Sequence, residues 1–197
     1  MTRLALVIAM LASLLLALPT AQAAPRCKLA GSKQVYKEGR ATVVTRKGHT
    51  FACHRDKGVF YRLEQRGTDF GSTIQSKRFA TAGKFLAYVE TFDTAAAGET
   101  AVEVRDLITG KVRTEEDASM SPEVASVTAL AVASSGAVAW IAIDGFMNDA
   151  IEVFAARLGG KSKLLATGAA IAKGSIAIRG ASVAWSENGA EKSAPLP

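Results

Sequence analysis

The chain has 197 residues, of which 49% are hydrophobic, 21% charged and 7% aromatic, and its formal net charge is +6. This composition excludes a disordered tail, a collagen-like or coiled-coil rod and, with 2 Cys, a mini-protein stapled by several disulfides. The length is that of one ordinary domain.

The first 23 residues have the pattern of a secretory signal peptide. Arg3 is followed by an unbroken apolar run over Leu4–Leu18, which Pro19 ends, and Ala21-Gln22-Ala23 supplies the small residues of a cleavage site. The run is shorter than the about 20 residues that span a bilayer. We therefore expect cleavage near Ala23, a secreted or extracytoplasmic domain over 24–197, and no stable membrane insertion after cleavage.

The two cysteines are expected to form a disulfide. Outside the cytosol Cys27 and Cys53 have one way to pair. A bridge that closes a loop of this length stabilises the folded chain by about 3.5 kcal/mol in the chain-entropy model. The alternative role of either cysteine is a reactive thiol, which the compartment disfavours.

Positive charge is concentrated in the N-terminal half of the mature chain. Residues 26–84 carry 14 Lys or Arg against 4 acids, whereas residues 85–197 carry 9 against 14. Such asymmetry is found in proteins that bind polyanions. The basic residues form no dense run, the closest being Arg46-Lys47 and Lys77-Arg78. We favour solvated strand faces, keep polyanion or cell-surface binding as an alternative, and expect no nucleic acid partner.

Four segments of the chain repeat one pattern. Each begins with a glycine, at Gly39, Gly83, Gly136 and Gly180, and the aligned segments end at Val44, Tyr88, Trp140 and Trp185. A spacing of about 40–50 residues is the period of propeller blades. The aromatic residues recur at this spacing, so we expect them in the core between blades rather than in a sugar-binding row.

Each repeat divides into short antiparallel strands. The repeats cover approximately 33–66, 74–117, 126–167 and 174–197, and the last lacks room for a fourth strand. Third strands such as 101–105 alternate apolar and charged residues, as period-two geometry requires. Three endings stay open: the segment 26–29 completes the last blade, two chains join as a homodimer in a larger ring, or the edge stays open beside Pro195 and Pro197.

These features resemble a known class of repeat protein. A glycine turn followed by Ala-Tyr or Ala-Trp, with VEVRDLITGK at Val102–Lys111, resembles the blades of WD-repeat and Tol-type propellers. The mature chain is also similar to small secreted bacterial proteins with propeller-like repeats and an N-terminal cysteine pair. The resemblance implies an all-β fold of about four propeller-like antiparallel blades and an extracytoplasmic location, but no activity. An open β-meander or a β-sandwich is the alternative fold.

Motifs for common chemistries are absent from the sequence. It contains no G-x-S-x-G, H-E-x-x-H, C-x-x-C, Walker loop or G-x-G-x-x-G. The two imidazoles, His49 and His54, are expected in a turn and on the surface, where catalysis is uncommon. We therefore predict no catalytic residue, no cofactor and no metal site of known spacing.

Acidic residues of the expected loops are the best candidates for a ligand site. Loops between second and third strands share one face of a propeller with the loops between blades. In the second and third repeats these loops were predicted to carry Glu90, Asp93, Asp144, Asn148 and Asp149. Such oxygens could hold a cation or form a glycosidase pair, although the spacing of Asp144 to Asp149 does not match a calcium loop.

The predicted function is therefore an exported, non-enzymatic binding or scaffold module with an unknown extracellular ligand or protein partner. A secreted hydrolase that uses the loop carboxylates is the first alternative. Polyanion or cell-surface binding through the basic N-terminal half is the second.

Overall fold

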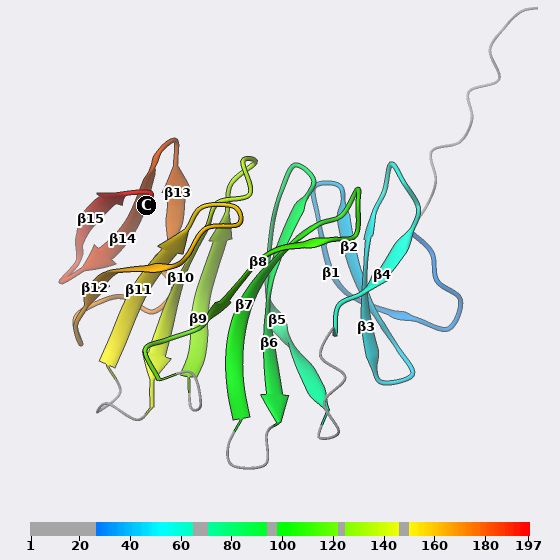
Figure 1. Cartoon of the computed structure of the whole chain (residues 1–197), viewed down its shortest axis with the longest axis horizontal. Helices are drawn as coiled ribbons and strands as arrows, with labels where there is room; N and C mark the ends of the chain where they lie inside the picture. Colours follow the sequence, from blue (N-terminus) through cyan, green and yellow to red (C-terminus); the bar gives the residue numbers. More distant parts are fainter. Residues whose placement is uncertain (1–26, 65–70, 94–97, 122–124, 146–149) are drawn as a thin grey trace, which may run out of the picture.

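The computed structural model describes residues 27–64, 71–93, 98–121, 125–145 and 150–197. Within these residues the chain forms strands and no helix, which confirms the all-β class (Figure 1). Residues 1–23, which the sequence predicts to be a signal peptide, lie outside the described part. No helix in the described part is long and apolar enough to cross a membrane.

The strands form four antiparallel sheets, each built from consecutive strands. Sheet A contains β1 (Lys33–Glu38), β2 (Ala41–Arg46), β3 (His49–His54) and β4 (Phe60–Arg62); sheet B contains β5 (Ser72–Ala82), β6 (Phe85–Asp93), β7 (Gly98–Asp106) and β8 (Val112–Asp117); sheet C contains β9 (Ala125–Val132), β10 (Val138–Asp144), β11 (Ala150–Ala156) and β12 (Lys163–Thr167); sheet D contains β13 (Ala177–Arg179), β14 (Ser182–Glu187) and β15 (Ala190–Pro195).

The repeated glycines make the turns between first and second strands. Gly39, Gly83, Gly136 and Gly180 have φ of +52°, +58°, +86° and +61°. These values lie in the left-handed region, which glycine enters without the steric cost that a Cβ brings. The repeat seen in the sequence is therefore a recurring turn that folds each first strand back onto its second.

The sheets lie side by side in chain order, with sheets A and D at opposite ends of the row (Figure 1). First strands of neighbouring sheets contact one another, β1 with β5, β5 with β9 and β9 with β13. This is the propeller-like arrangement that we expected. The segment from Cys27 is bonded to sheet A through Cys53, so it does not complete sheet D, which has three strands. That option for closing the ring was wrong.

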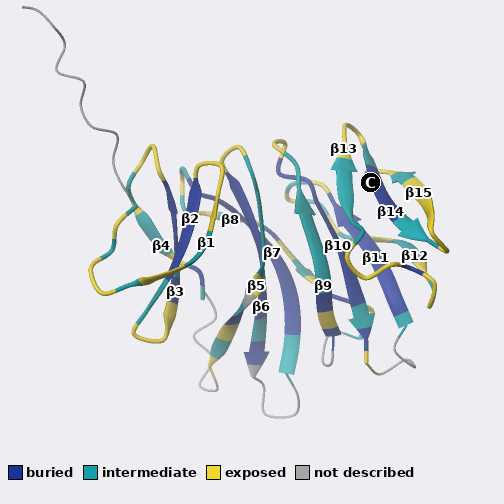
Figure 2. Cartoon of the chain, turned by 180° about the vertical axis from the view of Figure 1, so that it is seen from behind, coloured by how far each residue is buried: buried dark blue, intermediate teal, exposed yellow. Residues whose placement is uncertain are grey.

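Each pair of neighbouring sheets encloses its own apolar core. Alternation along a strand sends successive side chains to opposite faces, so a central sheet supplies both the core before it and the core after it. In β6, Leu86 and Tyr88 pack toward sheet A, whereas Ala87 and Val89 pack toward sheet C. Figure 2 shows that burial is deepest in the second and third strands of the middle sheets. Both faces of these strands are therefore buried, although β7 and β11 also bury charged residues such as Glu103 and Glu152.

Bulges on the first strands provide hydrogen bonds between sheets. The pairing register shifts at residue 35 in β1, at 75–78 in β5 and at residue 128 in β9. At or beside each shift a side chain reaches the next first strand or the segment that leads into it, and a bulge is a common way to re-aim a side chain. The contacts are Tyr36 Oη with Thr81 Oγ1 at 3.2 Å, Arg78 Nε to Val127 O at 2.6 Å, and Thr128 Oγ1 to Lys173 O at 2.7 Å.

The recurring aromatic residues supply a second kind of inter-sheet contact. Tyr88, Trp140 and Trp185 are all buried and face the preceding sheet, which confirms that they belong to the core. Tyr88 Oη lies 3.4 Å from Leu63 O, and Trp140 Nε1 donates to Ala118 O at 2.7 Å. Leu63 and Ala118 each follow the fourth strand of the preceding sheet. The same repeat position therefore ties sheet B to sheet A and sheet C to sheet B.

Candidate functional site

The acidic residues expected on loops lie mainly inside the molecule. Glu90 is fully buried in β6, and Asp144, at the end of β10, is 1% exposed. The prediction that these two residues lie on exposed loops was wrong, because the second strands extend further than the sequence pattern indicated. Asp93 ends β6. Asn148 and Asp149 fall outside the described residues.

Asp144 shares one face of sheet C with a buried acid that the sequence analysis did not single out. Glu152 in β11 pairs with Ala142 of β10, so its side chain points to the same face as that of Asp144, toward sheet B. Its Oε2 accepts the backbone N–H of Met120 at 3.2 Å, which joins sheet C to the segment after β8. Burial raises the pKa of Glu152; the Met120 N–H opposes this rise, and the nearby Asp144 carboxylate adds to it.

These two carboxyl groups have the residue types of an acid–base pair. A carboxyl group with a raised pKa can hold a proton to higher pH, as a general acid requires. Met120, whose N–H contacts Glu152, is exposed, whereas Asp144 and Glu152 themselves are 1% and 5% exposed. Among the described residues, no group of three His, Cys, Asp or Glu side chains is arranged to hold a metal ion.

A buried polar network lies between sheets A and B. Tyr88 Oη donates to Glu103 Oε2 at 2.5 Å, and Arg105 Nη2 donates to Tyr88 Oη at 3.2 Å and to Leu63 O at 3.3 Å. Burial, followed by the Glu103 carboxylate, raises the pKa of Tyr88 well above its usual value, although Arg105 opposes this effect. The tyrosine therefore stays neutral and works as a hydrogen-bonding link. Its alternating neighbours Glu103 and Arg105 were visible in the sequence as one charged face of a strand.

The two histidines differ in their surroundings. His49 is exposed at the start of β3, directly after the Lys47-Gly48 turn, as expected. His54 is 3% exposed, so its expected place on the surface was wrong. Its Nδ1 lies 3.9 Å from Asp56 Oδ2, which is too far for a hydrogen bond.

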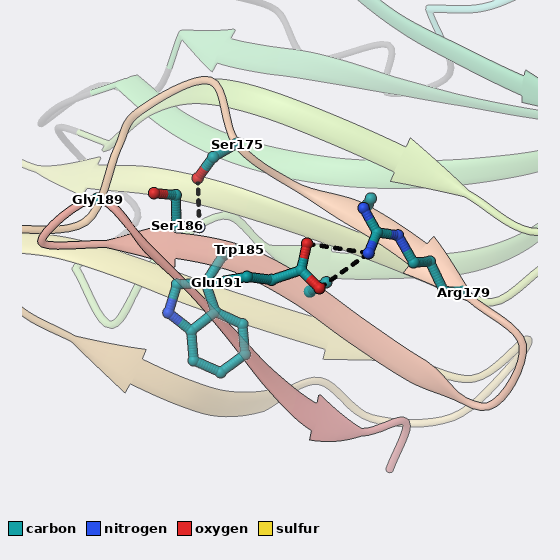
Figure 3. A pocket seen from close by; sticks show the side chains of 8 residues that line it. Ser175, Arg179, Trp185, Ser186, Gly189 and Glu191 are labelled. Carbon is teal, nitrogen blue, oxygen red and sulfur yellow. Dashed lines mark hydrogen bonds and ion pairs between the residues drawn. The ribbon is translucent and has the colours of Figure 1, made fainter.

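A hollow of about 300 Å³ lies on sheet D (Figure 3). Arg179 Nη1 contacts both carboxylate oxygens of Glu191 at 2.8 and 2.9 Å, and Ser175 Oγ accepts the backbone N–H of Ser186 at 2.8 Å. The polar groups of the hollow thus bind one another. Its lining residues are Ser175, Ala177, Arg179, Ala184, Trp185, Ser186, Gly189 and Glu191.

The predicted disulfide is present at the other end of the molecule. Cys27 and Cys53 are bonded, with a Cα–Cα distance of 5.8 Å. The bond holds the segment Cys27–Ser32, here called the strap, against sheet A. The strap and β1–β2 line a second hollow, of about 480 Å³, which includes Lys28 and Val44. Both ends of the row of sheets therefore carry a hollow. The hollow on sheet A is lined by Lys28 and no acidic residue, whereas the hollow on sheet D is lined by the Arg179–Glu191 pair.

Comparisons with known proteins give a distant structural likeness. No protein-family model and no curated protein matches the chain. Among solved structures it is similar to the crystal structure of Porphyromonas gingivalis dipeptidyl peptidase 4, with 9% identity and a TM-score of 0.57 over 80% of this chain and 29% of that one. The chain therefore spans less than a third of that protein's length. At this identity the likeness to a β-propeller-containing protein shows the fold alone.

Proposed function

We propose that the chain is an exported, non-enzymatic binding module. One observation carries the proposal: buried ionisable side chains take part in contacts that hold the frame together. Glu103 and Arg105 bind Tyr88 between sheets, and Glu152 binds the segment after β8. Asp106 accepts the N–H groups of its own turn and pairs with Lys84 at 2.7 Å. Groups engaged in this way stabilise a rigid scaffold, and the exposed charge is left for recognition.

Export is part of the same proposal. The leader pattern over residues 1–23 and the Cys27–Cys53 bond support it, because disulfides persist in oxidising compartments. A protein of this kind would present its surfaces to glycans, polymers or proteins outside the cytosol.

The experiment compares binding with turnover. Mature wild-type protein, spanning 24–197, is applied to a glycan array and incubated with a panel of chromogenic glycosides. We expect saturable binding without product release. A variant with Asp144→Asn and Glu152→Gln should bind as wild type does, as should the control with Asp117→Asn and Glu187→Gln, which removes the same charge elsewhere.

A secreted hydrolase is the second candidate, because Asp144 and Glu152 share a face and the pKa of Glu152 is raised. Glycosidases use two carboxyl groups of this kind. Product release by wild type that the Asp144/Glu152 variant loses and the control retains would establish the hydrolase and overturn the binding proposal.

A further inference from the structure

Sheet A has one face without a neighbouring sheet. Residues on β2 alternate, so Ala41 and Val43 pack toward sheet B while Thr42, Val44 and Arg46 point the other way. The pairing register extends this outer face across the sheet. It places Lys37, Thr42, Cys53 and Phe60 in one row, Gln34, Val44, Phe51 and Arg62 in the next, and Arg46 with His49 in a third.

The strap covers part of this face and leaves the rest accessible. Cys27 is fixed to Cys53 in the first row, and Val44 in the second row is only 3% exposed. A turn closes the strap, since the Ser32 N–H and Oγ both donate to Leu29 O, at 3.2 and 2.7 Å. The 480 Å³ hollow lies between this turn and the sheet. The described residues thus form a groove beside the strap rather than a closed core.

The accessible part of the face is cationic. Lys28 on the strap and Lys37 on β1 are exposed, and Arg46 on β2 is half-buried. None of the three forms an ion pair with another described residue. Arg62 is paired with Glu64 at 3.2 Å, and Glu64 is the acid associated with this face in the described structure. Glu38 lies on the other side, where its carboxylate accepts the Tyr36 hydroxyl.

Two aromatic rings lie among these cations. Phe51 pairs with Arg62, Phe60 pairs with Cys53, and both rings are half-buried on the outer face. A phenylalanine that served only as core would be covered by a neighbouring sheet, as Phe85 is between sheets B and C. Flat apolar rings beside Lys and Arg can contact the apolar faces of sugar rings while the cations bind their acidic groups. A flat membrane would not need a groove beside the strap.

We propose that the outer face of sheet A binds an anionic polysaccharide, with Lys28, Lys37 and Arg46 contacting its acidic groups and Phe51 packing on its sugar rings. This inference rests on the proposed binding function and names its ligand class and its site. It also gives a role to the concentration of basic residues in the N-terminal half of the chain.

The test uses mature protein with dextran sulfate as the probe and neutral dextran as its comparison. The site variant carries Lys28→Gln, Lys37→Gln and Arg46→Gln. The matched control carries Lys111→Gln, Lys163→Gln and Lys192→Gln, which removes three exposed charges from the turn before β8, from β12 and from β15. Fluorescence anisotropy is measured over a series of salt concentrations, and circular dichroism verifies that each variant is folded.

We expect wild type and the control to bind dextran sulfate and not neutral dextran. The site variant should bind about tenfold more weakly or worse, and its slope of log affinity against log salt should fall by about 2–3, since each lost contact contributes about 0.7–0.9. A further variant, Phe51→Ala, should weaken binding of dextran sulfate more than binding of inorganic polyphosphate, which has no sugar rings.

Three results would overturn the inference. Equal loss in the site variant and the control would show attraction by net charge alone. Tighter binding to single-stranded DNA or to anionic phosphatidylglycerol vesicles than to dextran sulfate would assign the face to another partner. If the wild type does not bind dextran sulfate, the proposed polysaccharide site on sheet A is wrong. Saturable binding on the glycan array would still support the more general proposal of a binding module.

Discussion

The aromatic residues of the last three repeats have the same place in the fold but different hydrogen bonding. Trp140 Nε1 donates to Ala118 O, whereas Tyr88 Oη donates to Glu103 Oε2 and Leu63 O accepts from Arg105 Nη2. The equivalent carbonyl in front of sheet D belongs to Gly168, and it accepts the Ile171 N–H instead, at 3.4 Å. Trp185 Nε1 is buried and has no hydrogen-bond partner among the described residues. The two tryptophans therefore differ in one buried bond.

This difference predicts unequal costs for the same substitution. Trp140→Phe removes the donor and leaves the Ala118 carbonyl buried without it, whereas Trp185→Phe removes a donor that makes no described bond. Both variants lose similar apolar area, so Trp140→Phe should reduce the free energy of unfolding by about 1–2 kcal/mol more than Trp185→Phe does. Urea unfolding of both variants measures the difference. Equal costs would mean that the Trp140 bond contributes nothing.

The pKa of Glu152 predicts how stability changes with pH. Its folded pKa is raised above the unfolded value near 4.5, so the folded state holds the proton while the unfolded state releases it. Stability contributed by this group therefore falls as pH rises from about 4.5 through the folded pKa. Glu152→Gln removes this dependence. The melting temperature of the variant, relative to that of wild type, should therefore increase as pH rises.

Asp106 provides the opposite control. Burial alone would raise its pKa, but the Lys84 ammonium and the N–H groups of Ile108 and Thr109 outweigh burial and lower the pKa. Stability from Asp106 is therefore present above the unfolded pKa and lost as pH falls through the folded one. The Asp106→Asn variant should therefore show its largest loss of stability, relative to wild type, near neutral pH. If the melting temperatures of Glu152→Gln and Asp106→Asn each differ from that of wild type by the same amount at every pH, both pKa directions are contradicted.

At the scale of strands and turns, the sequence predicted the order of elements well and their ends poorly. The glycines with positive φ, and the aromatic residues four or five positions after them, reflect local geometry, so they are visible in the sequence. The length of β6 depends on its pairing with β5 and β7 as far as Phe92 and Asp93, which local pattern does not reveal. Glu90 was therefore assigned to a loop, although it is a buried strand residue. His54 was misplaced because its burial depends on the neighbouring sheet.

The disulfide should contribute to stability in proportion to the loop that it closes. The bonded cysteines are 26 residues apart, which corresponds to about 3.5 kcal/mol in the chain-entropy model. The double variant Cys27→Ser and Cys53→Ser should lose about this much free energy of unfolding in guanidinium titrations. Trypsin should also cut after Lys28 faster in the double variant. Unchanged stability and unchanged cleavage would show that the strap stays in place without its bond.

The contact between the β7–β8 turn and sheet A can be tested at Gly110. A Cβ at Gly110 would lie 2.2 Å from Tyr61 Cε1, whereas a Cβ at Gly39 would meet nothing within 4 Å. Both glycines have positive φ, so Gly39→Ala reports the backbone cost, about 1 kcal/mol. Gly110→Ala should cost at least about 1 kcal/mol more, because the alanine displaces the Tyr61 ring from between the sheets. Thermal unfolding of the two variants compares them, and equal costs would argue against this packing.

In the complete fold, the outer faces of the two end sheets, A and D, are covered in different ways. The strap covers part of sheet A, and the outward side of sheet D carries serines and the Arg179–Glu191 pair instead of an apolar face. Terminal units of repeat proteins need such polar or covered faces to stay soluble. β15 adds charged residues and Pro195, which protect an edge strand from pairing. In the described residues, the strap on sheet A and the polar groups on sheet D thus occupy part of the faces on which a further sheet would pack.

We propose that these four sheets, which form an open row, bind their ligand as a single chain. The solution mass of the mature protein is measured by light scattering at concentrations up to about 100 µM. This concentration is well above the dissociation constant of a specific dimer, for example about 1 µM. The mass of one chain at every concentration is the result that the structure predicts. The mass of two chains would contradict it, because two rows would then join their end sheets into a larger ring.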